Sequence, residues 1–77
     1  MDLKTAITAV DKDYFELTGE YQDRAEIMAE VRKGTDTAEL AEMLRSGEAP
    51  EVVDAYQVVV EASDEEILTA LAELAHW

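Results

Sequence analysis

The clearest helix signal in the chain is the C-terminal sequence Ser63-Asp64-Glu65-Glu66-Ile67-Leu68-Thr69-Ala70-Leu71-Ala72-Glu73-Leu74-Ala75-His76-Trp77. Ser63 is a favourable N-cap, and Glu66 three residues later completes a capping-box pattern. The three acids after Ser63 stand in the first turn, where the helix dipole stabilises negative charge. Apolar residues then recur at helical spacing and define one face: Ile67, Leu71 and Leu74, widened by Leu68 and Ala75. We expect this face to be the central packing surface, so the rest of the chain must cover it.

The first eighteen residues carry a second helical pattern. Leu3, Ile7, Val10, Tyr14 and Leu17 are separated by four, three, four and three residues, and Asp2 can cap the segment. The same register continues to Tyr21, Met28 and Val31, which favours helix. The alternative is a β-hairpin of residues 5–10 and 14–18, because both segments are rich in β-branched and aromatic residues.

The middle of the chain divides at its glycines and its single proline. One helix is predicted for residues 20–33, between Gly19 and Gly34. The next begins with the capping-box pattern of Asp36 and Glu39 and ends at Gly47, and the one after it has Pro50 in its first turn. Three successive valines leave a strand at 56–62 as an alternative. The predicted inner faces of these helices contain Tyr21, Ala25, Ile27, Met28, Val31, Leu40, Met43, Leu44, Val52, Val53, Tyr56, Val59 and Val60.

These patterns predict an all-α fold, a compact bundle of four or five short helices. The alternative is a small α+β domain with a two- or three-stranded sheet built from residues 5–10, 14–18 and 56–62. A length of 77 residues indicates one acidic globular domain spanning 1–77. Hydrophobic residues make up 48% of the chain and Gly and Pro together number four, which argues against disorder.

Charge is the property that most restricts function. Nineteen Asp and Glu oppose six Lys and Arg, for a formal net charge of −13. Such a chain is repelled by phosphates, so we expect no direct binding to nucleic acid and no binding to an anionic membrane. The expected partner is instead a basic protein surface, that of a nucleic-acid-binding protein or complex, whose association the charge would accelerate.

Few residues are suited to catalysis or to a cofactor. There is no cysteine, the one histidine is His76 near the C-terminus, and the two serines are explained by helix ends. Asp11, Asp13 and Glu16 faintly resemble a calcium loop, but Phe15 stands at the fifth position and Glu16 at the sixth, where a ligand and a glycine are required. We therefore predict no catalytic residue, no metal, no cofactor and no enzymatic activity.

Acidic residues recur at intervals of three or four along the N-terminal part of the chain. If both segments are helical they form a nearly continuous acidic ribbon, with neighbouring Cβ atoms about 5–6 Å apart, similar to the spacing of nucleic-acid phosphates. The predicted partner-binding surface comprises Asp13, Glu16, Glu20, Asp23, Glu26 and Glu30, together with Asp64 and Glu65. The alternative is an ordinary solvated helix face, or the acidic surface of a halophilic protein, since the chain has only three lysines.

Two aromatic residues are candidate anchors for a partner. Tyr14 and Phe15 are adjacent and point to different sides of a helix, so Phe15 is expected at the surface. Trp77 either packs under a neighbouring helix or extends as an anchor. A large aromatic side chain rimmed by carboxylates is a plausible interaction hot spot.

In size, predicted helical content and charge the chain is similar to small phage-encoded inhibitors that imitate nucleic acid, including some anti-restriction and anti-CRISPR proteins. The resemblance implies a non-enzymatic inhibitor that blocks the DNA- or RNA-binding surface of a host defence complex. The alternatives are a small helical adapter or assembly chaperone that binds through an apolar patch, and a stand-alone halophilic domain. Without a signal peptide or a long apolar run, the expected location is the cytoplasm, that of the host if the chain is phage-encoded.

Overall fold

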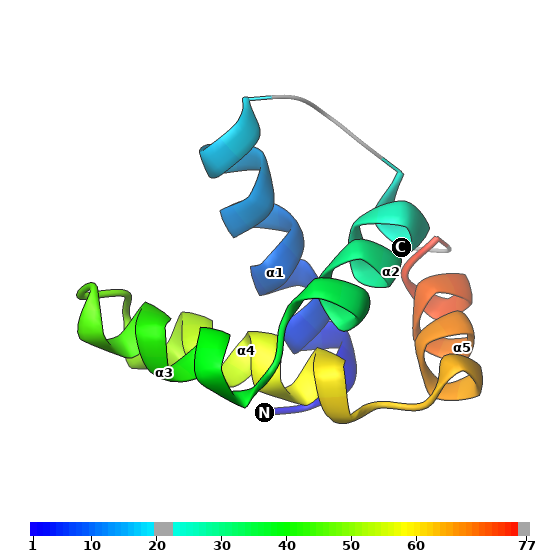
Figure 1. Cartoon of the computed structure of the whole chain (residues 1–77). Coiled ribbons are helices and arrows are strands. Elements are labelled where there is room, and N and C mark those ends of the chain that lie inside the picture. The colour runs from blue at the N-terminus through cyan, green and yellow to red at the C-terminus, as the bar shows by residue number, and fades with distance from the viewer. Residues whose placement is uncertain (20–22, 76–77) are drawn as a thin grey trace.

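The computed structural model describes residues 1–19 and 23–75 and shows five helices. They are α1 (Leu3–Thr18), α2 (Arg24–Gly34), α3 (Thr37–Arg45), α4 (Pro50–Glu61) and α5 (Asp64–Leu74) (Figure 1). The prediction of an all-α bundle is confirmed. No strand occurs in the described part of the chain, so the hairpin and the strand at 56–62 were wrong. Three valines in a row are accommodated because they lie on a helix whose apolar face packs against α1, and packing outweighs β-propensity.

Side-chain caps define where four of these helices begin. Asp2 accepts a hydrogen bond from the backbone N–H of Thr5 at 2.8 Å, and Asp23 and Asp36 cap α2 and α3 in the same way. Ser63 forms the complete capping box: its hydroxyl accepts from the Glu66 N–H at 3.2 Å, while the Glu66 carboxylate accepts from the Ser63 N–H at 3.1 Å. These caps satisfy N–H groups that have no partner within the helix, and the sequence predicted those of Asp2, Asp36 and Ser63.

Gly19 ends α1 in the left-handed conformation, with φ of 72°, and its N–H bonds to the Phe15 carbonyl at 2.7 Å. The same conformation occurs at Gly47, with φ of 94°, after α3. A side chain would be strained at either position, which explains glycine at both helix ends.

The centre of the molecule is the contact between α1 and α4. Of all helix pairs these two pack most extensively, and α4 also contacts α2 and α3, while α5 covers α1 and α2 from the side. The fully buried side chains Ile7, Val10, Ile27, Met28 and Val59 come from α1, α2 and α4. The expectation that the α5 face is the central packing surface was therefore wrong: α5 closes one side with Ile67 and Ala70.

Three leucines expected in the core are exposed. Leu17 is 72% exposed, Leu44 52% and Leu68 63%. The buried residues of α1 all lie in its first half, so its C-terminal turns extend past the helices that cover it. Ala25 and Ala75 are exposed as well, whereas Ala6, Ala55, Ala62 and Ala70 are buried. Within residues 1–19 and 23–75, no helix is both long and apolar enough to cross a bilayer.

Candidate protein-binding surface

The predicted acidic ribbon is divided between two helices. α1 ends at Thr18 and α2 begins at Arg24, with Asp23 serving as the N-cap between them. Figure 1 shows that the axes of α1 and α2 diverge where the first ends and the second begins. The carboxylates of Glu16 on α1 and of Glu26 and Glu30 on α2 are exposed. Glu20 lies outside the described residues.

Asp13 connects α1 to α4. Its carboxylate accepts a hydrogen bond of 2.7 Å from the hydroxyl of Tyr56, a residue only 6% exposed. Burial raises the pKa of Tyr56 well above its usual range, and the hydrogen bond to Asp13 and the negative charges of Asp13 and Glu48 act in the same direction. The Tyr56 hydroxyl therefore remains a donor throughout the physiological pH range, and Asp13 has a structural role that the sequence pattern did not reveal.

Replacing Tyr56 by Phe is expected to lower the free energy of unfolding by about 1–2 kcal/mol at pH 7, because the Asp13 carboxylate loses its donor. The pKa of Tyr56 is higher in the folded than in the unfolded chain, so this stabilisation is complete below the unfolded value of about 10 and declines as pH rises above it. Urea unfolding of both proteins at pH 7 and above pH 10 measures the effect. A stability difference that stays constant or widens at high pH would contradict the assignment.

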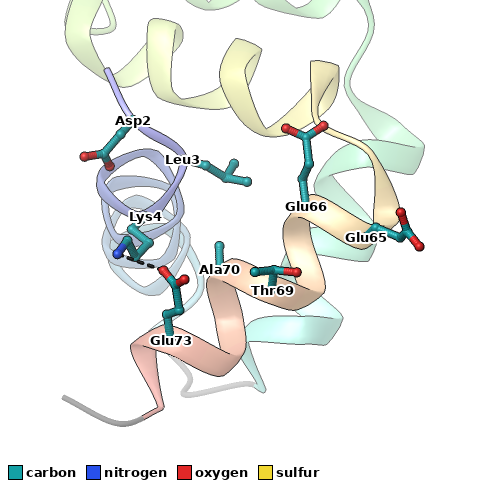
Figure 2. Close-up of a pocket in the computed structure, with 8 residues that line it drawn as sticks. All are labelled: Asp2, Leu3, Lys4, Glu65, Glu66, Thr69, Ala70 and Glu73. Carbon is teal, nitrogen blue, oxygen red and sulfur yellow. Dashed lines mark ion pairs between the residues drawn. The ribbon is translucent and has the colours of Figure 1, made fainter.

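Asp64 and Glu65 lie in the first turn of α5. The Asp64 carboxylate pairs with the guanidinium of Arg32 and so connects α5 to the end of α2. Glu65 is exposed and lines a hollow of about 460 Å³ between α1 and α5 (Figure 2). The two predicted residues thus differ: Asp64 is partly neutralised by a cation, and Glu65 faces outward.

The hollow between α1 and α5 is acidic, but four of the five charged side chains that line it have local partners. Figure 2 shows Lys4 and Glu73 facing each other, with Nζ and Oε2 2.8 Å apart. The hydrogen bond with Glu73 raises the pKa of Lys4, and the hydrogen bonds from Thr5 lower the pKa of Asp2. Glu66 is engaged in the capping box. This hollow is thus mainly a junction between two helices.

A second depression, which we call the tyrosine groove, lies between α1, the C-terminal half of α2, α3 and the middle of α4. It has a volume of about 360 Å³. Five large side chains line it: Tyr14, Leu17, Val31, Met43 and Tyr56. Glu30, Glu39 and Glu48 stand among them, together with Gly34 and Thr35, and no Lys or Arg belongs to the lining. The sequence pattern placed its apolar residues in the core and therefore did not predict a groove.

Of the two predicted aromatic anchors, Phe15 and Trp77, the structure describes only Phe15. Phe15 is 37% exposed on α1, next to the half-buried Tyr14, as the helical pattern predicted. Trp77 lies outside the described residues. The aromatic surface that the structure does describe is therefore at the C-terminal half of α1, close to the tyrosine groove.

Metal-binding side chains do not gather in the described part of the chain. No set of three or more His, Cys, Asp and Glu side chains there is arranged to hold a metal ion. Ser46 donates to the Met43 carbonyl at 3.0 Å, and Ser63 is a cap, so both hydroxyls have local roles.

The chain matches no protein-family model, and no curated protein or solved structure matches it significantly.

Proposed function

We propose that this protein is a non-enzymatic inhibitor that occupies the basic nucleic-acid-binding surface of a partner protein. The observation that carries the proposal is the distribution of charge. Fifteen of the eighteen described Asp and Glu residues are exposed, and every helix contributes to them. The ion pairs of the described residues engage only Asp11, Glu42, Asp64 and Glu73. Most of the described carboxylates are thus exposed and belong to none of these ion pairs.

Exposed carboxylates on a helical scaffold can replace phosphates in a basic channel. Each phosphate that meets a Lys or Arg releases condensed counterions, which makes binding strongly salt-dependent. A protein of net charge −13 draws a basic partner by the same long-range attraction and is held by desolvated ion pairs. A host defence complex that binds DNA or RNA is a partner of this kind, as the similarity to nucleic-acid-mimicking inhibitors suggests.

The test is capture of partners from a cleared lysate on the immobilised protein, followed by elution with salt and, separately, with short duplex DNA. Nucleic-acid-binding proteins released by both treatments support the proposal. The variant Glu16→Gln, Asp23→Asn, Glu26→Gln is expected to weaken capture about tenfold at low salt. The slope of log affinity against log salt concentration should fall by roughly one for each contact that is lost. Asn at position 23 preserves the cap of α2.

The matched control is Glu51→Gln, Asp54→Asn, Glu61→Gln on α4, which removes the same charge from another helix. Equal losses in both variants would indicate attraction by net charge alone. Capture that neither salt nor DNA reverses would contradict the proposal. Circular dichroism at low salt tests the halophilic alternative, which requires the chain to unfold there.

A further inference from the structure

We propose that the tyrosine groove is a docking site for a basic segment of a partner protein that inserts a large apolar side chain. The inference rests on the proposed function and specifies the partner: its basic surface carries an apolar anchor beside its Lys or Arg residues. The groove would thereby add a local, shape-dependent contact to an otherwise diffuse electrostatic attraction.

The apolar part of the groove is formed where α1 extends beyond its covering helices. Tyr14 and Leu17, three residues apart, lie on the same side of α1, and Leu17 is 72% exposed. Met43 of α3 is half-buried on the opposite wall, and Val31 and Tyr56 are buried at the base. In Figure 1 the C-terminal end of α1 extends away from α3 and α4. An inserted side chain would cover Leu17, which the fold itself leaves to solvent.

The charged part of the groove has one sign. Glu30 comes from α2, Glu39 from the first turn of α3, and Glu48 from the connection between α3 and α4. The charge of Glu48 reaches the base of the groove, because it contributes to the raised pKa of Tyr56. By contrast, the α1–α5 hollow includes Lys4, paired with Glu73. Both linings carry a net charge of −3, but the described lining of the tyrosine groove contains no cation and places its carboxylates beside the exposed Leu17.

Charge complementarity selects the occupant. Lys and Arg can lay their aliphatic stems along the apolar wall while their cationic ends meet the three carboxylates. A second copy of this chain, also at −13, would be repelled, and so would nucleic acid. An uncharged apolar ligand would lower the hydration of Glu30, Glu39 and Glu48 without compensating them. A basic segment with an apolar anchor satisfies both parts of the lining.

The inference can be tested with the synthetic peptide Leu-Lys-Lys-Leu-Leu-Lys-Lys-Leu and a version in which Ser replaces every Leu. Binding is measured by calorimetry, and its location by amide chemical-shift changes in a ¹⁵N-labelled protein. We expect the leucine peptide to bind at least about tenfold more tightly than the serine peptide, and its largest shifts to fall around Tyr14, Leu17 and Met43. Leu17→Ser is expected to weaken it about tenfold. The matched control is Leu68→Ser, an equally apolar and exposed change on α5 that should leave binding unaltered.

The contribution of the three groove carboxylates is tested with the same leucine peptide. Glu30→Gln, Glu39→Gln, Glu48→Gln should weaken the leucine peptide more than Glu61→Gln, Glu65→Gln, Glu73→Gln, which removes three charges from α4 and α5. Equal effects of the two triple variants, no effect of Leu17→Ser, or shifts spread over all helices would overturn the groove as a docking site. The proposed function is judged separately: partners that the Leu17→Ser protein captures as tightly as the wild type does, and that duplex DNA still displaces, would refute the groove and leave the inhibitor proposal standing.

Discussion

Replacing Ile7 by Ala is expected to lower the free energy of unfolding by about 2–5 kcal/mol. Ile7 is completely buried in α1 and belongs to the core that α1, α2 and α4 share. Its truncation removes apolar contacts and leaves a cavity that neighbouring helices fill only partly. A chain of this length has a total stability of about 4–12 kcal/mol, so the variant would lose much of its stability. Urea unfolding followed by circular dichroism at 222 nm measures the change.

Leu17→Ala is the matched control, because Leu17 belongs to the same apolar stripe in the sequence but is 72% exposed. Its effect is expected to stay within about 0.5 kcal/mol. If Leu17→Ala and Ile7→Ala lowered the free energy of unfolding by similar amounts, α1 would be covered along its whole length, in contradiction to the structure. The same Leu17 side chain should nevertheless matter for peptide binding, so stability and docking are separable at one position.

Replacing Ala55 by Leu is expected to cost about 1–3 kcal/mol through overpacking. Ala55 on α4 and Ala6 on α1 are both completely buried, and their helices form the most extensive contact in the molecule. A larger side chain at this crossing forces the two helices apart or into unfavourable rotamers, since protein interiors are close-packed. Thermal unfolding of the variant and the wild type measures the loss.

Ala72→Leu on α5 provides the control for this second prediction. Ala72 is exposed, and both alanine and leucine favour helix, so the midpoint should hardly change. A stabilising effect of Ala55→Leu would indicate a void between α1 and α4 and would contradict the packing described above.

The local signals of the chain predicted most of its secondary structure. Asp2, Asp36 and Ser63 cap helices as the sequence pattern indicated, and Gly19 ends α1 in a left-handed conformation. Caps and turns depend on residues three or four positions apart, so their information is contained in the sequence itself. The start of α2 was misplaced because apolar periodicity continued through the break, and the role of Asp23 as a cap was missed.

Only part of the candidate site could be predicted from the sequence. Glu30 was predicted as an exposed acid, but its position beside Leu17 and Met43 depends on how α1, α2 and α3 pack. Asp13 appeared equivalent to the other acids, and only the fold brings it to the Tyr56 hydroxyl, forty-three residues away. Spacing shows which residues share a helix face, whereas it carries no information on which other helix covers that face.

The C-terminal sequence that begins at Ser63 illustrates both what local spacing determines and what packing between helices decides. By itself the sequence determined that a helix starts there, that its first turn is acidic and that Ile67, Leu71 and Leu74 lie on the side toward the protein, because these are properties of one helix. Only the tertiary structure decided that α5 covers the flank of an α1–α4 centre and leaves Leu68 exposed. The physical reason is that burial depends on the positions of the other helices, and those positions follow from close packing between residues distant in sequence.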